Sequence, residues 1–332
     1  MNVFKNTFSL AGLAGLLALT PGARTAAADD SQLFTFKFHT NQPLVYAITM
    51  KSRTVMDNNV GGKTSLVKNS SEVRYKIRLT DAGKKLDGAT AVFYEPFDVE
   101  EDLDVVGTGH VVTQIRGLQV RSTQNGIVTI DPEKSVGLAQ AKPIKTGVYP
   151  IMLSGYLYLD PAGHVKKVEG DLPFIDHWTE ALKQDIGFFH VHFPSHAVGV
   201  QEAWTENVSV NAAGGVTLAD PLTTTNTFTR ELDQTTDGNR VATFTKADAC
   251  HLQNLGGYFE QMGQKSSLNV SQFDQNSSGT FHFDPKRGVL LDAKSNDSGT
   301  VAVEMLVQGN AATSHLDMQM EMQMTLTEPP AK

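Results

Sequence analysis

The sequence feature that most limits the fold is a strict alternation of apolar and polar residues near the end of the chain. From Leu316 to Leu326, leucine or methionine occupies every second position, with aspartate, glutamine, glutamate or threonine between them. Successive side chains of a β-strand point to opposite faces of a sheet, whereas helical spacing would spread these apolar residues around the helix. The segment is therefore predicted to be a long strand with one buried face and one hydrated face.

Shorter segments with the same two-residue period occur throughout the chain. They are rich in aromatic or β-branched residues, they are bounded by glycine, asparagine and aspartate, and they span residues 34–38, 73–79, 156–159 and 281–283. Such patterns are typical of antiparallel sheets with one covered face. A helical period is clear only between Leu172 and Gly187, where apolar residues recur at steps of three and four.

One strand–turn–strand motif occurs twice. Residues Ser154–Gly163 match Ser278–Gly288, because both combine alternating apolar residues with an Asp-Pro turn and a glycine. An Asp-Gly pair followed by an apolar run precedes each copy, at Asp87 and at Asp237. Self-similarity in the same order indicates an internal duplication.

The chain has 332 residues, which favours two domains or one large β unit. The predicted fold is mainly β, a β-sandwich type of protein with two duplicated antiparallel β-sheet lobes joined by one helix. The N-terminal β lobe is assigned to residues 31–171, the helix and linker to 172–193, and the C-terminal β lobe to 194–328. Because Cys250 is the single cysteine, no intramolecular disulfide stabilises these lobes.

Residues 1–28 have the pattern of a signal peptide. Lys5 supplies a positive charge, an apolar stretch runs from Phe8 to Leu19, and three alanines ending at Ala28 form a small-residue cleavage site. The apolar stretch is too short for the roughly 20 residues that span a bilayer, so no membrane span is expected. The mature protein is therefore predicted to begin at Asp29, to be exported, and to be soluble in the periplasm or secreted.

Two segments resemble motifs of a known family. Phe193 to Trp204 reads FPSHAVGVQEAW, and Gly279 to Gly288 reads GTFHFDPKRG. They are similar to segments of a family of bacterial exported proteins defined as a domain of unknown function, in which the first follows a mid-chain helix and the second precedes the last hairpin. Gln201 stands where that family has glycine. The resemblance covers nearly all of the mature chain and implies no particular activity.

The charge of the chain excludes one class of partner. Its formal net charge is −8, and no run of basic residues occurs. Binding to nucleic acid depends on clustered lysine and arginine, so no nucleic acid is expected. Gly62-Lys63-Thr64 resembles the end of a phosphate-binding loop, but that motif needs a glycine at position 57, which here is aspartate.

One histidine cluster is a candidate metal site. His190 and His192 would share one face of a strand, and His196 follows four residues later. Imidazoles that point the same way are suited to bind zinc, although a catalytic zinc needs three protein ligands. The alternative is a hydrated polar face opposite a phenylalanine face.

Four methionines form the second candidate site. Met318, Met320, Met322 and Met324 share the apolar face of the alternating strand. They suit the core of a sheet, an adaptable groove for an apolar ligand, or a Cu(I) site with thioether ligands.

No catalytic motif is recognisable, so the chain is predicted to be a non-catalytic protein without a cofactor. The preferred function is that of an exported binding or envelope-associated protein that holds an apolar small molecule or an envelope protein between its sheets. One alternative is a metal-dependent enzyme or metal-binding protein that uses the His190 and His192 face. The other is a structural module of the cell envelope.

Overall fold

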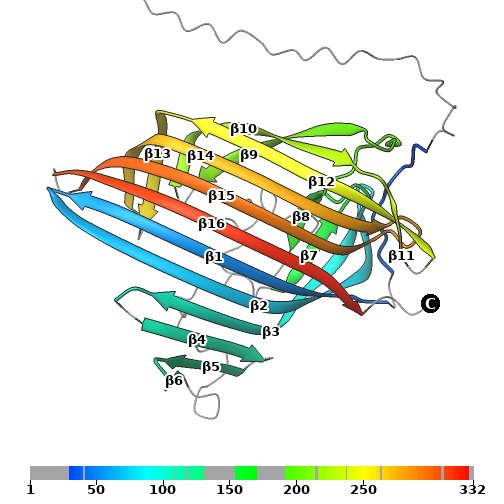
Figure 1. The fold of residues 1–332 in the computed structure, drawn as a ribbon, viewed down its shortest axis with the longest axis horizontal. Helices are drawn as coiled ribbons and strands as arrows, with labels where there is room; N and C mark the ends of the chain where they lie inside the picture. Colours follow the sequence, from blue (N-terminus) through cyan, green and yellow to red (C-terminus); the bar gives the residue numbers. More distant parts are fainter. Residues whose placement is uncertain are drawn as a thin grey trace, which may run out of the picture. The chain divides into compact units, whose positions relative to one another are not determined.

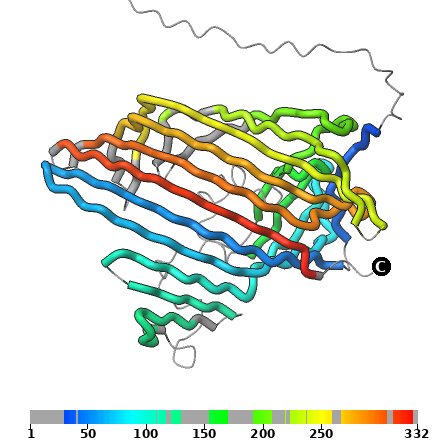
Figure 2. Tube along the Cα trace, in the orientation of Figure 1, coloured from blue at the N-terminus to red at the C-terminus, as the bar shows by residue number. Residues whose placement is uncertain are grey.

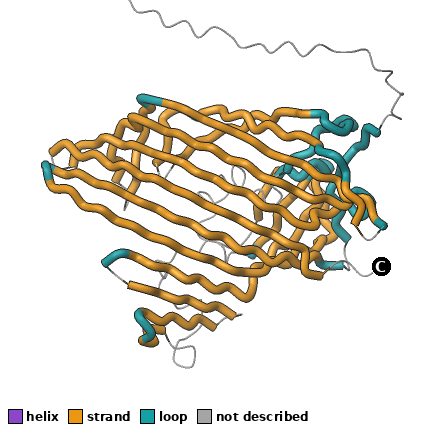
Figure 3. Tube along the Cα trace, viewed as in Figure 1, coloured by secondary structure: helices purple, strands orange, loops and turns teal. Residues whose placement is uncertain are grey.

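The computed structural model describes residues 30–39, 42–107, 109–116, 119–130, 154–169, 191–213, 216–236, 238–261, 264–307 and 310–328. The predicted signal peptide, the whole of the predicted helix at 172–187, and His190 lie outside these residues. Within them every regular element is a strand (Figure 3). No helix long and apolar enough to cross a bilayer occurs in this part of the chain.

Sixteen strands are present in the described ranges. Their bounds are β1 Leu44–Val60, β2 Lys63–Leu86, β3 Ala89–Val105, β4 Gly109–Arg116, β5 Gln119–Gln124, β6 Ile127–Ile130, β7 Gly155–Leu159, β8 Val165–Glu169, β9 Ala203–Ala213, β10 Val216–Arg230, β11 Gln234–Thr236, β12 Asn239–Leu252, β13 Leu255–Gln261, β14 Gln264–Asp284, β15 Val289–Val307 and β16 Asn310–Glu328. The predicted strand at 316–326 lies within β16, and its alternation of buried and exposed residues is confirmed.

The strands form one antiparallel sheet (Figure 1). Its main path runs β11-β12-β10-β13-β14-β15-β16-β1-β2-β3-β4-β5-β6, while β7 pairs with β3 and β8, β9 pairs with β10, and β12 also pairs with β14. Long hairpins account for much of this order. Leu44–Val60 of β1 pairs with Lys63–Leu79 of β2 around the turn at Gly61 and Gly62, and β14 and β15 form a second long hairpin around the turn at 285–288. Neighbours in sequence thus become neighbours in the sheet.

The prediction of two separate lobes is wrong. β1 belongs to the expected N-terminal lobe and β16 to the expected C-terminal lobe, yet they pair from Val45 to Val60 (Figure 2). Residues 31–332 accordingly form one compact unit. The physical reason is that both strands carry a matching apolar face, and joining the two halves removes two sheet edges that would otherwise expose unpaired backbone groups. The joining helix falls outside the described residues.

The two copies of the repeated motif have corresponding pairings. In the first copy β3 pairs with β7, and β7 pairs with β8 across the turn at Asp160. In the second copy β12 pairs with β14, and β14 pairs with β15 across the turn at Asp284. The internal duplication stays a prediction, and these pairings define which strands a superposition must match.

The N-terminal segment 31–39 connects the two repeated turns. The amide of Phe36 donates to the carbonyl oxygen of Pro161 at 2.8 Å, and the amide of Lys37 donates to that of Gly288 at 2.9 Å. Gly163 has a φ of +101°, and a Cβ there would lie 2.7 Å from the Phe36 ring. Glycine therefore lets the turn adopt its conformation and lets the segment approach it closely.

Two apolar clusters lie on the same face of the sheet, which we call the core face. The first contains the rings of Phe34, Phe193, Phe244 and Phe283, with the centroids of Phe34 and Phe244 4.9 Å apart. The second contains Leu268, Val270, Phe273, Val301 and Val303. A β-bulge after Val270 brings Val270 and Phe273 to one face despite their odd spacing.

Candidate functional site

The four predicted methionines all lie on the core face of β16, but their surroundings differ. Met322 and Met324 are 9% and 1% exposed and belong to the first apolar cluster. Met318 is half-buried and packs against the second cluster. Met320, also half-buried, lies between them. The hypothesis that the methionines form the core thus applies to Met322 and Met324, whereas Met318 and Met320 are partly exposed to solvent.

The neighbours of Met320 are polar. It pairs with Ser52 of β1 on one side and with Asp297 of β15 on the other. Side chains directly opposite each other in an antiparallel pair are in contact range, so Met320 is flanked by a hydroxyl and a carboxyl group. The middle of the methionine row is therefore not part of a continuous apolar surface.

Polar residues form a band across the core face at this position. The register places them at neighbouring levels of β2, β1, β15, β14 and β12, with Met318 and Met320 of β16 between those of β1 and those of β15. We define the polar band as Asn69, Ser71, Ser52, Thr54, Ser295, Asp297, Ser277, Gln275, Lys246 and Asp248. The hydroxyls of Ser52 and Ser71 are 2.8 Å apart and share a hydrogen bond. The band separates the two apolar clusters.

Several polar groups of the band are buried, and one of them lacks a partner. The Oδ1 atom of Asn69 is buried and lacks a hydrogen bond, whereas the buried hydroxyl of Ser295 interacts with the carboxyl group of Asp297. Burial also raises the pKa of Asp297, while a hydrogen bond with Ser277, the charge of Lys246 and a hydrogen bond with Ser295 act in the opposite direction. Lys246 itself forms a 3.1 Å ion pair with Asp248, and these side chains are only 15% and 9% exposed. Unsatisfied buried groups each cost about 1–3 kcal/mol, so a bound polar group would stabilise this band.

A buried acid lies on the same face, next to the band. Glu101 of β3 is 3% exposed, pairs with Val73 of β2, and has no hydrogen bond at Oε2. Burial raises its pKa to about 7. Glu101 does not lie on a sheet edge, because β3 is paired with both β2 and β4 at this point.

The predicted histidine cluster is only partly assembled. His192 lies half-buried beside β9, whereas the side chain of His196 is 61% exposed and lies 3.6 Å from Glu202. His190 is outside the described residues. Neither predicted companion is thus shown next to His192.

His192 instead meets residues from two other segments. Nδ1 of His192 is 2.6 Å from Oε2 of Glu206 in β9, and Nε2 of His164, which precedes β8, is 2.9 Å from Oε1 of the same carboxylate. The two imidazole rings have centroids 4.5 Å apart. The ring of Trp204, two residues before Glu206, donates from Nε1 to the carbonyl oxygen of His192 at 2.9 Å and so holds its backbone in place.

Asp160 supports this group from the repeated turn. One of its carboxylate oxygens lies 3.0 Å from Nδ1 of His164, and the other accepts a hydrogen bond from the His164 amide at 2.9 Å. Lys166 also lies 3.1 Å from the carboxylate. The aspartate therefore orients the imidazole and directs its Nε2 atom towards Glu206.

The charges in this group reinforce one another. Hydrogen bonds with Asp160 and then Glu206 raise the pKa of His164 to about 9, although burial opposes this. Burial alone would raise the pKa of Glu206, but hydrogen bonds from His164 and His192 outweigh it and lower the pKa to about 2. The pKa of Asp160 is likewise below its usual range, because hydrogen bonds from His164 and Lys166 outweigh its burial.

Sequence reasoning missed His164, Glu206 and Asp160 as companions of His192. One signal was present in the repeat itself. His164 follows the first Asp-Pro turn, where the second copy has Val289. A polar residue that replaces an apolar one at a matched position indicates a local role that the other copy lacks.

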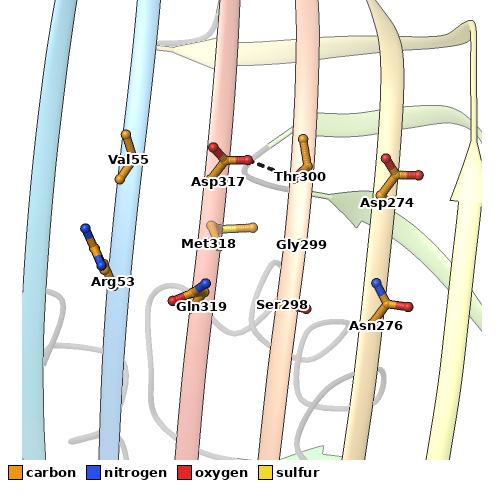
Figure 4. A pocket seen from close by; sticks show the side chains of 10 residues that line it. All are labelled: Arg53, Val55, Asp274, Asn276, Ser298, Gly299, Thr300, Asp317, Met318 and Gln319. Carbon is orange, nitrogen blue, oxygen red and sulfur yellow. Dashed lines mark hydrogen bonds between the residues drawn. The ribbon is translucent and has the colours of Figure 1, made fainter.

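A surface pocket of about 300 Å³ lies on the opposite, solvent-facing side of the same strands (Figure 4). Two cross-strand rows line it, one of Arg53, Gln319, Ser298 and Asn276 and the other of Val55, Asp317, Thr300 and Asp274, and the predicted residue Met318 lines it between the rows together with Gly299. The hydroxyl of Thr300 donates to Asp317 at 2.8 Å. This lining is mostly polar, so the pocket does not suit the apolar ligand expected from the sequence.

Comparisons with known proteins give no family. No family model matches the chain, and no curated protein matches it. The resemblance to the exported family therefore stays a prediction.

Solved structures that match include one titled "Asymmetric conductivity of engineered proteins", with 9% identity, 83% of this chain and 99% of that chain covered, and a TM-score of 0.21. The translocator domain of the autotransporter NalP from Neisseria meningitidis is 6% identical, the match covers 83% of this chain and 88% of that chain, and the TM-score is 0.15. OccK11 (OpdR) from Pseudomonas aeruginosa is 8% identical, the match covers 89% of this chain and 100% of that chain, and the TM-score is 0.20.

Proposed function

We propose that this protein is an exported, non-catalytic binding protein whose ligand is an amphiphile. The observation that carries the proposal is the position of Met320, half-buried between Ser52 and Asp297 at the boundary of an apolar cluster and a polar band. Export rests on the signal-peptide pattern of residues 1–28 and implies a location in the periplasm or outside the cell.

The apolar part of the ligand would lie on the second cluster. Its buried residues are bordered by half-buried apolar side chains, namely Cys250, Leu252, Leu255, Met305, Leu316 and Met318. Methionine is flexible and polarizable, so Met318 adapts to chains of different shape. Covering such a rim removes apolar surface from water, at about 25 cal/mol per Å².

The polar part of the ligand would lie at the polar band. Asn69 there offers an unpaired acceptor, while Lys246 and Asp248 provide a donor and an acceptor. Because the ion pair between Lys246 and Asp248 is already balanced, an uncharged or zwitterionic head group fits better than a strongly charged one. The sealed first cluster would take no part in binding.

The direct test uses a fluorescent lysophosphatidylcholine, which has one acyl chain and a zwitterionic head group, as the probe. The parent protein should bind it saturably, and native mass spectrometry of protein from its host should show a lipid-sized adduct. Met320→Lys should weaken probe binding at least tenfold, because it places a charge between the apolar and polar parts of the site.

Gln323→Lys is the matched control, since it adds the same charge to the exposed face of β16. Lys246→Met repeats the test without adding a charge, and circular dichroism reports folding of each variant. Equal binding by the parent, Met320→Lys and Lys246→Met would refute the proposal. A folded parent without adduct or probe binding would favour a structural module of the envelope.

A further inference from the structure

A second, independent feature of the structure is the group formed by His164, His192 and Glu206. One ligand atom of each residue lies within 4.8 Å of the others, and all three side chains are half-buried. They come from three separate places in the chain, the turn before β8, the segment before β9, and β9 itself. Three ligands of this kind on one site are the usual protein contribution to a zinc ion with an open position.

The distances fit a metal ion after a small adjustment. Zinc bonds of about 2.0–2.1 Å in tetrahedral geometry separate neighbouring ligand atoms by ~3.3 Å. The imidazole nitrogens of His164 and His192 are now 2.9 and 2.6 Å from the carboxylate oxygens of Glu206. Side-chain rotations that move these ligand atoms apart by a few tenths of an ångström would therefore make room for the ion.

Asp160 provides what a metal-binding histidine needs from its surroundings. Metal-ligating imidazoles commonly donate their other N–H to a carboxylate, which sets the tautomer and raises the basicity of the ligand nitrogen. Nδ1 of His164 is 3.0 Å from Asp160, so Nε2 is left for the metal. Trp204 holds the backbone of His192 through its hydrogen bond at 2.9 Å.

We infer that His164 Nε2, His192 Nδ1 and the Glu206 carboxylate bind a divalent transition-metal ion, with zinc the first candidate, and that Asp160 is a positioning residue for His164. Imidazole and carboxylate ligands suit zinc better than the thioether ligands that favour Cu(I). Side-chain exposures of 33%, 22% and 22% leave the site open to water or a small anion at a fourth position. The ring nitrogens that face Glu206 must be unprotonated to bind the metal ion, so metal binding releases any proton bound to them.

The test is titration of the chelator-treated mature protein with zinc chloride by calorimetry, with cobalt(II) chloride as a spectroscopic probe. The parent should bind one equivalent, and cobalt should give the visible absorption of a four-coordinate site. His192→Ala and Glu206→Gln should each weaken binding at least tenfold. Asp160→Asn should weaken it by about 10- to 100-fold without changing the stoichiometry.

Two histidine variants locate the site. His196→Ala alters an exposed histidine four residues from His192. His110→Ala alters a histidine 3.3 Å from Asp102 and 3.1 Å from Asp104 on β3, a surface group that offers similar atoms. Both variants should keep parental affinity. Loss of binding in His110→Ala, unchanged binding in folded His192→Ala and Glu206→Gln, or no saturable binding by the parent would each overturn the inference.

Discussion

Glu206 and His192, 14 positions apart in the chain, lie with a carboxylate oxygen 2.6 Å from an imidazole nitrogen. His192 was expected to share a strand face with His190, but the described residues around it are not in a strand. The chain from Val191 to Glu202 instead turns back onto β9, where Nε1 of Trp204 donates a hydrogen bond to the carbonyl oxygen of His192. The companion ligand is therefore set by this turn rather than by strand spacing.

Metal addition should stabilise the protein if the inferred site exists. Zinc at a hundredfold excess over its Kd would favour the folded state by about 2.7 kcal/mol, because the unfolded chain lacks the assembled ligands. We expect a rise of a few degrees in Tm, reversed by a chelator and absent in His192→Ala. Differential scanning fluorimetry measures it, with His196→Ala as the variant that should respond like the parent. An identical rise in the parent and His192→Ala would place the metal elsewhere.

The methionine row should respond unevenly to charge. Met324 is 1% exposed within the first cluster, so Met324→Lys should lower the free energy of unfolding by about 3 kcal/mol or more. Met320→Lys should cost less, because the new ammonium group would lie opposite the carboxyl of Asp297. Urea denaturation measures both, and Gln323→Lys on the exposed face should stay within about 0.5 kcal/mol of the parent. Equal losses at the two methionines would show that the whole row is sealed core.

Glu101 should make stability fall as pH rises. Its pKa is about 7 in the folded protein against an ordinary value of 4.5, so the folded state favours the protonated acid. The cost of ionising it therefore grows between about pH 4.5 and 7 and stays at higher pH. Glu101→Gln should be more stable than the parent by about 1 kcal/mol at pH 8 and about equal at pH 4.

Urea denaturation at the two pH values measures this difference. Glu321→Gln is the control, because Glu321 is exposed and forms a surface pair with Lys294 at 3.2 Å, which contributes little. The same pH dependence in the parent and in Glu101→Gln would contradict the assignment.

Gly163 should be more sensitive than another glycine with a similar backbone. Gly163→Ala adds a Cβ 2.7 Å from the Phe36 ring at a φ of +101°, so a loss of about 2 kcal/mol or more is expected. Gly126→Ala meets no atom within 4 Å at a φ of +79° and should lose only about 1 kcal/mol. Thermal unfolding of the two variants compares the costs. Equal losses would mean that the N-terminal segment does not press on the turn.

The sequence predicted the features of this protein that depend on neighbouring residues. The alternation from Leu316 to Leu326 implies a strand with two unlike faces, since side chains of a strand alternate in direction whatever the strand pairs with. The Asp-Pro turns at Asp160 and Asp284 likewise lie between paired strands, as the repeat indicated. These features were predictable because they follow from local backbone geometry.

Tertiary structure decided which strands and side chains meet. The alternation of apolar and polar residues does not determine which strand a given strand pairs with. Two lobes were therefore expected, whereas β1 and β16 pair with each other in one sheet. Met320 looks like its neighbouring methionines in sequence, and only the register places it between Ser52 and Asp297. Glu206 lies 42 positions from His164, and contact between them depends on the packing of segments that share no local pattern. Local sequence determines the direction of a side chain, whereas its partner depends on how distant segments bury their surfaces against each other.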